Sequence, residues 1–309
     1  MHFLLVGPGA LGCLLASIVS KGMSDSDRLT VLDYNADRAK HLSKEGIGYH
    51  LEKQLVAVPI TAVSDPQVLD SVDVVLLCVK SYDVINSLEY CKAILSKNTL
   101  LIFMQNGISH LDLQDHLHDV TVAFGTTTEG ATLLGTGQVR HAGSGVTYLG
   151  FLEPPGKQGA TLLQQTHDVL SAGGLQAHLT DNILARLWAK LFVNAGINAL
   201  TAILGCKNGD LLTLPGIDRR MEAAVDEAIQ IAKEKNIPIM DEPHQTTRIV
   251  CRKTAKNVSS MLQDVRNKRR TEIDAINGAV VTLGKESGID TPENSRLYNQ
   301  IKELEASYV

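Results

Sequence analysis

A glycine-rich turn near the amino terminus constrains the fold of this chain more than any other feature. The turn, Gly7-Pro-Gly-Ala-Leu-Gly12, follows the apolar run Phe3–Val6 and opens a segment with helical periodicity. In a GxGxxG turn the first glycine permits the bend, the second lets a pyrophosphate approach the backbone, and the third allows close helix–strand packing. Free N–H groups at the helix N-terminus then face the phosphates. We therefore expect a dinucleotide site here, with a purely structural glycine-rich turn as the alternative.

Asp33 bears on the kind of dinucleotide. It ends a second apolar run, Leu29–Leu32, about twenty residues after Gly12. A carboxylate in this place accepts hydrogen bonds from the ribose hydroxyls of NAD and repels the 2′-phosphate of NADP, which an arginine would bind. Tyr34 follows directly, and Arg38 is at least half a helical turn away. The residues alone favour NAD(H), with a helix cap or turn as the alternative role for Asp33.

The first half of the chain alternates short apolar runs with helical patterns. Further strands are expected at Val74–Val79, Thr99–Met104 and Val120–Phe124, and helices near Asp37–Ser43 and Asp83–Ile94. This alternation is typical of an α/β fold with a doubly wound parallel sheet, which binds ligands at the carboxyl ends of its strands. Residues 125–152 are rich in glycine and threonine and predict hairpins instead.

Strand signals almost vanish after Asp181. Helical periodicity is found at Ile183–Leu204, Arg219–Lys235, His244–Asp264 and Thr271–Glu286. An α/β half followed by a helical half predicts two domains: a dinucleotide-binding Rossmann domain over residues 1–180 and a helical substrate and catalytic domain over residues 181–309.

Composition excludes several classes of protein. The 309 residues carry 29 basic and 34 acidic side chains, so the net charge of −5 gives no basic footprint for nucleic acid. Five cysteines without CxxC or Cys/His spacing predict free thiols and no metal site. No uninterrupted apolar run is long enough to span a bilayer, and no leader peptide is recognisable, so we expect a cytoplasmic protein without a membrane partner.

The helix expected at Ile183–Leu204 is apolar except for one stripe. Lys190, Asn194 and Asn198 are spaced i, i+4 and i+8 and so share a face. An unpaired buried ammonium is costly, and asparagine is a poor helix former. The stripe therefore favours a site for a small polar substrate, with a snorkelling lysine as the alternative. A partly desolvated lysine has a lowered pKa and can protonate a developing alkoxide.

A third group of polar residues lies further along the chain. Asn257 and Ser260 are three residues apart and would share a helix face. Thr271 and Asp274 have the spacing of a capping box, which would place Glu272 in the first turn of a helix, beside its dipole. On spacing alone, ordinary capping and surface polarity explain these residues better than a site does.

Together these segments resemble the ketopantoate reductase family (2-dehydropantoate 2-reductases). The resemblance covers nearly the whole chain, and its late motifs are specific. The matching motifs are GPGALG, Val79-Lys80, Gln105-Asn106-Gly107, Gly125-Thr-Thr-Thr128, Trp188-Ala-Lys190-Leu-Phe-Val-Asn194, Ile197-Asn198, Asn208-Gly209, Asn257-Val-Ser-Ser-Met-Leu-Gln-Asp264, Thr271-Glu-Ile-Asp274 and Pro292-Glu-Asn294.

The resemblance implies a role for each matching residue in the reduction of 2-dehydropantoate to (R)-pantoate for pantothenate and coenzyme A synthesis. Lys190 would donate the proton, with Glu272 as a second catalytic residue. The substrate would be bound by Asn194, Asn198, Asn208, Asn257 and Ser260. The cofactor would be bound by Gly7, Pro8, Gly9, Ala10, Leu11, Gly12, Asp33, Lys80, Asn106, Ala131 and Glu272. It also implies a Rossmann domain followed by a helical domain, as in 6-phosphogluconate dehydrogenase, with the nicotinamide between them.

One position departs from the family pattern. Members usually carry an arginine at the end of the second strand to bind the 2′-phosphate of NADPH, whereas Tyr34 stands there, behind Asp33. The resemblance thus implies NADP(H), while these residues favour NAD(H). An NAD-dependent D-2-hydroxyacid dehydrogenase acting on another 2-ketoacid is one alternative, and a non-catalytic dinucleotide sensor is another. The sequence leaves open whether the helical half packs on itself or in a homodimer.

Overall fold

The computed structural model describes residues 1–51 and 54–308, which form two compact units. The first unit comprises Met1–Gln105 and Asp112–Ile183. The second, called the helical unit below, comprises Asn106–Leu111 and the chain from Leu184 onward. A short segment in the first half of the sequence therefore belongs to the helical unit.

The first unit is built on an eight-stranded sheet with the order β12-β11-β8-β7-β6-β1-β2-β5. Neighbouring strands are parallel except β8 and β11. The strands are β1 (His2–Val6), β2 (Arg28–Leu32), β5 (Thr61–Val63), β6 (Val74–Leu77), β7 (Leu100–Phe103), β8 (Thr121–Thr127), β11 (Thr147–Gly150) and β12 (Ala177–Leu179). The strand order reverses between β1 and β6, which is where a doubly wound sheet opens a crevice for a ligand. The predicted doubly wound fold is confirmed.

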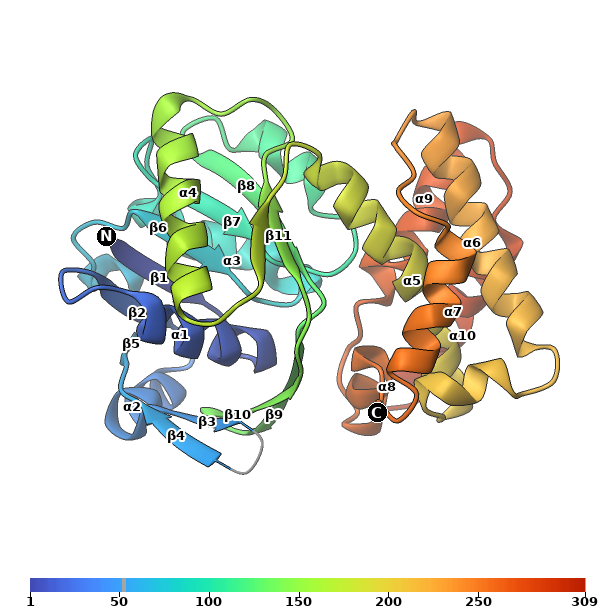
Figure 1. Ribbon diagram of the computed structural model, residues 1–309, viewed down its shortest axis with the longest axis horizontal. Coiled ribbons are helices and arrows are strands. Elements are labelled where there is room, and N and C mark those ends of the chain that lie inside the picture. The colour runs from blue at the N-terminus through green and yellow to red at the C-terminus, as the bar shows by residue number, and fades with distance from the viewer. Residues whose placement is uncertain (52–53, 309) are drawn as a thin grey trace. The chain divides into compact units, whose positions relative to one another are not determined.

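Helices α1 (Ala10–Gly22) and α4 (Lys157–Ala172) lie side by side on this sheet (Figure 1). They approach closely because Gly22 has no side chain: a Cβ there would lie 2.0 Å from the Val169 carbonyl oxygen. Helix α2 (Ala36–Glu45) contacts β5, and α3 (Val84–Cys91) follows β6. The apolar runs of β1, β6 and β7 are fully buried, as expected for strands covered on both faces.

A second sheet in the first unit has the order β4-β3-β10-β9. Its strands are β3 (Ile47–Leu51), β4 (Gln54–Val58), β9 (Gly130–Gly135) and β10 (Gln138–Gly143). Strands β9 and β10 form an antiparallel hairpin, as the glycine-rich stretch after residue 125 predicted. Strands β3 and β4 were not predicted from the sequence.

The helical unit contains α5 (Ile183–Leu204), α6 (Ile217–Glu234), α7 (Pro243–Lys253), α8 (Ser260–Arg266), α9 (Asn277–Ser287) and α10 (Pro292–Ala306). Helix α5 has the predicted bounds. The helix expected over 244–264 is wrong, because the chain breaks at 254–259 and restarts where the Ser259 hydroxyl accepts from the Leu262 N–H at 3.1 Å. The helix expected from Thr271 begins only at Asn277, after a 3-10 helix at Ile273–Ala275.

Helix α10 is fixed at its N-terminus by a buried carboxylate. Glu227 of α6 accepts from the backbone N–H groups of Glu293 (2.7 Å) and Asn294 (2.8 Å). The Asn294 amide also donates to Glu227 and accepts from Asn277 of α9. An anion at a helix N-terminus satisfies N–H groups that have no partner within the helix. The Pro292-Glu-Asn294 motif is thus a structural anchor between three helices.

Helix α5 is long and apolar enough to cross a membrane, but 67% of its most apolar 18-residue window is buried inside the protein. It is therefore a core helix in this structure.

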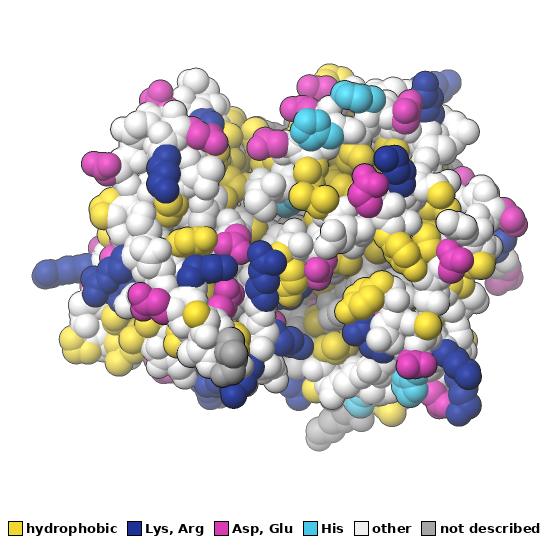
Figure 2. Space-filling view, turned by 180° about the vertical axis from the view of Figure 1, so that it is seen from behind, with side chains coloured by type: hydrophobic (Ala, Val, Ile, Leu, Met, Phe, Trp, Pro, Cys, Tyr) yellow, Lys and Arg dark blue, Asp and Glu magenta, His cyan; other side chains and the backbone are white. Residues whose placement is uncertain are grey.

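Lys/Arg and Asp/Glu side chains are interspersed over the face seen in Figure 2 instead of forming one basic surface.

Candidate functional site

The polar stripe of α5 lies on a helix whose other faces form core. Trp188, Leu191 and Phe192 are at most 2% exposed. Lys190 and Asn194 are half-buried, and Asn198 is buried. Because the apolar neighbours fix the rotation of the helix, the stripe is held in one direction.

Lys190 meets two other predicted site residues of the helical unit. Its Nζ donates to the Asn106 Oδ1 atom at 2.7 Å, and the Asn106 Nδ2 group donates to Glu272 Oε2 at 2.9 Å. One carboxamide thus links an ammonium to a carboxylate, accepting from the first and donating to the second. The structure brings together the two residues expected to be catalytic and one expected to bind the cofactor.

The segment that carries Asn106 is held against the segment that carries Glu272. Ile108 N–H donates to the Ala275 carbonyl oxygen at 3.2 Å. Gly107 has a φ of +76°, and a Cβ there would lie 2.0 Å from the same oxygen. Only glycine allows both this backbone conformation and this close approach. The Gln105-Asn106-Gly107 motif therefore has a geometric reason for its glycine.

Burial and charge tune the titratable groups around this contact. Desolvation lowers the pKa of Lys190 to about 8, while the Glu272 carboxylate raises it. His110, 1% exposed, lies on the same segment as Asn106; desolvation lowers the pKa of His110 to about 4, again opposed by Glu272. A lysine ammonium with a pKa near the working range is able to give up a proton. His110 stays neutral at neutral pH.

The capping box expected at Thr271 and Asp274 is wrong. Glu272 precedes a 3-10 helix, and the Asp274 carboxylate accepts from Tyr298 and Arg270. The Thr271 hydroxyl donates to Glu305 and accepts from the Ile273 N–H. Glu272 is only 5% exposed, so surface polarity does not explain it.

The remaining predicted substrate residues form a second group in the helical unit. The Asn208 N–H donates to the Asn257 carbonyl oxygen at 3.1 Å, and its Nδ2 donates to Thr254. Asn208 Oδ1 is buried and has no hydrogen-bond partner within the described residues. Asn257 and Ser260 are exposed, and they do not share a helix face because Asn257 lies in the break before α8.

A residue near the C-terminus of α5, Thr201, contacts the segment that carries Asn257 and Ser260. The Thr201 hydroxyl donates to Ser259 Oγ at 2.7 Å. Ser259 is buried and caps α8, while its neighbour Ser260 is exposed. Ser259 was not singled out in the sequence, although the serine pair before Met261 is a signal for a helix start.

In the first unit, the glycine-rich turn has the geometry that a dinucleotide needs. Gly7 has a φ of +88°, and a Cβ there would lie 2.5 Å from Val79 Cγ1. A Cβ on Gly12 would lie 2.1 Å from the Gly7 carbonyl oxygen, whereas a Cβ on Gly9 would meet no atom within 4 Å among the described residues. Two glycines are therefore required by packing, and the third leaves open space at the start of α1. These residues fit a bound pyrophosphate.

Asp33 is 2% exposed at the end of β2, and both of its carboxylate oxygens are engaged. Arg38 of α2 donates from Nε to Oδ2 at 2.8 Å and from a terminal nitrogen to Oδ1 at 2.6 Å. The guanidinium also lies over the Tyr34 ring, 4.9 Å from its centroid. The Asp33 carboxylate in turn holds the pKa of Arg38 above its ordinary value. The sequence missed this pair, which forms because α2 starts at the Asn35 cap.

Of the other predicted cofactor residues, Asn106 and Glu272 lie in the helical unit and the rest lie in the first unit. Lys80 follows β6 and is half-buried; Val79, its neighbour, is the residue that Gly7 approaches. Pro8, Ala10 and Leu11 complete the turn and the start of α1. Ala131 is half-buried on β9, in the smaller sheet.

Comparison with known proteins identifies the relatives of this chain. The family model described as "Ketopantoate reductase PanE/ApbA" matches residues 3–154, and its C-terminal counterpart matches residues 182–305. A 2-dehydropantoate 2-reductase of Halobacterium salinarum is 31% identical over 94% of this chain and 95% of its own.

Solved structures agree with this relationship. A PanE/ApbA family ketopantoate reductase from Ralstonia eutropha superposes with a TM-score of 0.90 at 27% identity, covering 100% of this chain and 99% of its own. A D-mandelate dehydrogenase, solved with NADH and anilino(oxo)acetate, gives a TM-score of 0.91 at 28% identity with the same coverage. The chain therefore belongs to the ketopantoate reductase family of NAD(P)-dependent oxidoreductases.

Proposed function

We propose that this protein reduces 2-dehydropantoate to (R)-pantoate, with Lys190 as the proton donor. The observation that carries the proposal is the contact of Lys190 with Asn106 and, through it, Glu272. The motifs shared with the family, over nearly the whole chain, support this substrate.

Reduction of a ketone requires a hydride at carbon and a proton at oxygen. The reduced nicotinamide, when bound, supplies the hydride to C2 of the 2-ketoacid. The C2–O double bond becomes a single bond, and the Lys190 ammonium transfers one proton to that oxygen and becomes a neutral amine. Since the pKa of Lys190 is about 8, roughly nine-tenths of the lysine is protonated at pH 7 and ready to donate. Solvent then returns the proton to the amine.

Asn106 and Glu272 orient this lysine. The Asn106 Oδ1 atom accepts one of the three N–H groups of the ammonium and leaves the others for the substrate. Glu272 fixes the orientation of the Asn106 amide, because a carboxylate can only accept from its Nδ2 side. The carboxylate also offsets part of the desolvation that lowers the lysine pKa.

The substrate's carboxylate and hydroxyl groups suit the remaining polar residues. Asn194 and Asn198 continue the stripe from Lys190, and Asn208 has a buried oxygen that can accept from a hydroxyl. Exposed Asn257 and Ser260 would complete the site. Carboxamides and hydroxyls both donate and accept, so they match a hydroxy acid better than a purely cationic site would.

The test is a reductase assay that follows absorbance at the nicotinamide band with 2-dehydropantoate. Lys190→Ala should keep its affinity for the cofactor and lose kcat by roughly 10²–10⁴-fold, the usual contribution of general acid catalysis. Lys233→Ala, an exposed lysine of α6, is the matched control and should be indistinguishable from wild type. Wild-type turnover in Lys190→Ala would reject the assignment.

We also propose that NAD(H) is the preferred cofactor. Tyr34 stands where the family usually has an arginine, and the negative charge of Asp33, directly before it at the end of β2, disfavours a 2′-phosphate. Arg38 neutralises this carboxylate in part, so the preference is expected to be a matter of degree. The D-mandelate dehydrogenase of similar fold is described with NADH.

A second candidate function is oxidation and reduction of another 2-hydroxy acid. The similarity to D-mandelate dehydrogenase, together with Asp33, favours it. Steady-state rates with 2-dehydropantoate, phenylglyoxylate and ketoisovalerate, each with both cofactors, separate the two. We expect a cytoplasmic enzyme in either case, since its five cysteines are free.

A further inference from the structure

We infer that the last helix, α10, positions Glu272 through the carboxylate of Glu305. This inference rests on the proposed role of the Lys190–Asn106–Glu272 contact. Glu305 is thus a positioning residue, 33 positions after Glu272 in the sequence.

On the N-terminal side, Glu305 binds Thr271 by two hydrogen bonds. The Thr271 backbone N–H and its hydroxyl both donate to Glu305 Oε1 at 2.7 Å. Thr271 is 0% exposed, and the Glu305 side chain is 11% exposed. Charge-assisted hydrogen bonds of this length are among the stronger ones in proteins. They fix Thr271, the residue immediately before Glu272.

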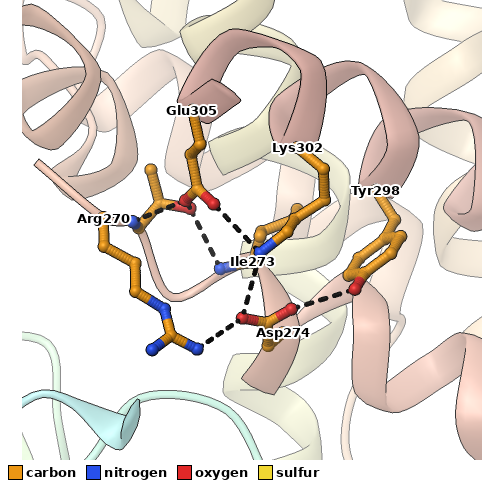
Figure 3. Close-up of polar contacts among 7 residues, drawn as sticks. Arg270, Ile273, Asp274, Tyr298, Lys302 and Glu305 are labelled. Carbon is orange, nitrogen blue, oxygen red and sulfur yellow. Dashed lines mark hydrogen bonds and ion pairs between the residues drawn. The ribbon is translucent and has the colours of Figure 1, made fainter. Parts of the chain in front are cut away.

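On the C-terminal side, Asp274 is held by the same face of α10. The Tyr298 hydroxyl donates to Asp274 Oδ1 at 3.1 Å, and Lys302 Nζ lies 3.5 Å from Oδ2. Arg270 also donates to Oδ2, at 3.1 Å. Figure 3 shows Tyr298, Lys302 and Glu305 reaching from α10 toward this segment. Glu272 is therefore flanked by two anchored residues.

Helix α10 itself is a firm support. Glu227 fixes its N-terminus, as described above, and Leu297 and Ile301 are 0% exposed on its core side. Lys302 bridges the two acidic anchors, since its Nζ also lies 3.1 Å from Glu305 Oε2. The network thus couples the orientation of Glu272 to a rigid helix and not to the short 3-10 turn alone.

The effect of Glu305 on the orientation of Glu272 can be measured as a change in the pKa of Lys190. Glu272 is the charged group that acts on its ammonium, and Glu272 also acts on His110. The contacts given above join Glu305 to Thr271, Arg270 and Lys302 to Asp274, and Lys302 to Glu305. The Glu272 carboxylate raises the pKa of Lys190 against desolvation. If Glu305 is truncated, the buried Thr271 donors lose their acceptor, the segment relaxes, and Glu272 no longer faces Asn106 in a fixed geometry. The Lys190 pKa should then fall below about 8.

The experiment compares Glu305→Ala, Glu305→Gln and the control Glu303→Ala, an exposed glutamate of the same helix. Two readouts are taken on the full chain: the pH dependence of kcat, and the pH midpoint of Lys190 labelling by an amine-selective reagent, followed by mass spectrometry. We expect Glu305→Ala to lower kcat about tenfold, with the NADH Kd unchanged, and to lower both midpoints; tenfold corresponds to 1.4 kcal/mol. Glu305→Gln keeps an acceptor oxygen for Thr271 and should restore most of the rate. Glu303→Ala should match wild type.

Several outcomes overturn the inference. Equal effects of Glu305→Ala and Glu305→Gln would show that only the charge of Glu305 matters, and a loss of melting temperature with unchanged midpoints would show a merely structural role. Should Glu305→Ala fail to fold, Glu305→Asp, which withdraws the oxygens by one methylene, must lower the labelling midpoint. The labelling needs no turnover, so it decides the inference even where no 2-ketoacid is reduced, an outcome that would reject the proposed function alone.

Discussion

Two apolar helices, α1 in the first unit and α5 in the helical unit, offer their polar groups in opposite ways. Helix α1 presents its N-terminus, where we propose that backbone N–H groups bind a phosphate and where a Cβ on Gly9 would meet no atom within 4 Å among the described residues. Helix α5 presents its flank, where Lys190, Asn194 and Asn198 supply specific functional groups. The site at the start of α1 depends on steric space, so a single added methyl group can abolish binding there. The site on α5 depends on charge and hydrogen bonding, so a change of pH can abolish its activity.

The largest effect is expected from adding a methyl group at the start of α1. In Gly12→Ala the Cβ would lie 2.1 Å from the Gly7 carbonyl oxygen, so the turn has to shift. Overpacking of this kind costs about 1–3 kcal/mol or more. In Gly9→Ala the Cβ enters open space, so stability should be unchanged while the NADH Kd rises at least about tenfold, because a pyrophosphate needs that space. Thermal unfolding and fluorescence titration with NADH measure the two effects.

The matched control is Gly156→Ala. Gly156 also precedes a helix, α4, and a Cβ there meets no atom within 4 Å among the described residues. Neither melting temperature nor NADH binding should change. Tight NADH binding by Gly9→Ala would show that the phosphates do not approach the backbone at this residue.

An intermediate effect is expected when pH is raised across the pKa of Lys190. Ketone reduction needs the ammonium form, so kcat/KM should be level below about pH 8 and fall about tenfold per pH unit above it. Oxidation of the hydroxy acid needs the neutral amine and should show the opposite slope. In Glu272→Gln the reductive limb should move to lower pH, because the carboxylate that raises the pKa of Lys190 is gone.

This profile is measured with one buffer system at constant ionic strength. A reductive rate that stays level to pH 10 in the wild type would contradict a role for Lys190 as the acid. An unchanged limb in Glu272→Gln would show that Glu272 does not act on the lysine in the working enzyme.

The smallest effect is expected at the end of β2. Asp33→Ala combined with Tyr34→Arg removes a carboxylate and adds a cation where a 2′-phosphate would lie, so the ratio of kcat/KM for NADPH to that for NADH should rise about tenfold, or 1.4 kcal/mol. Removing Asp33 also leaves the Arg38 guanidinium without its carboxylate partner, which adds to the positive charge available to a 2′-phosphate. Identical ratios in the wild type and the double variant would remove the argument for Asp33 as the selector.

Local patterns predicted much of the fold. The runs of β1, β6 and β7 are uniformly apolar because both faces of the sheet are covered, and α5 keeps helical periodicity from Ile183 to Leu204. Strands β3 and β4 could not be predicted in this way. They are partly exposed and exist through pairing, with β3 bonded to β10 some ninety residues later.

The contacts of the candidate site were likewise beyond prediction from local sequence. The polar stripe on α5 is visible from spacing alone, but its partner Asn106 is 84 residues from Lys190 and 166 from Glu272. The buried Thr271, read as a cap from its spacing, is explained by Glu305, which lies on a helix the sequence did not predict. Contacts of this kind depend on tertiary packing, which no window of neighbouring residues contains.

The passage of residues 106–111 through the helical unit has a consequence for how such a chain can be cut or recombined. A fragment that starts at Leu184 would fold, if at all, without the amide that holds the Lys190 ammonium and without the glycine that fits against Ala275. Cutting the chain between Ile183 and Leu184 therefore yields a helical unit that lacks residues 106–111. The two units are thus interleaved in the polypeptide, and a single cut does not separate them.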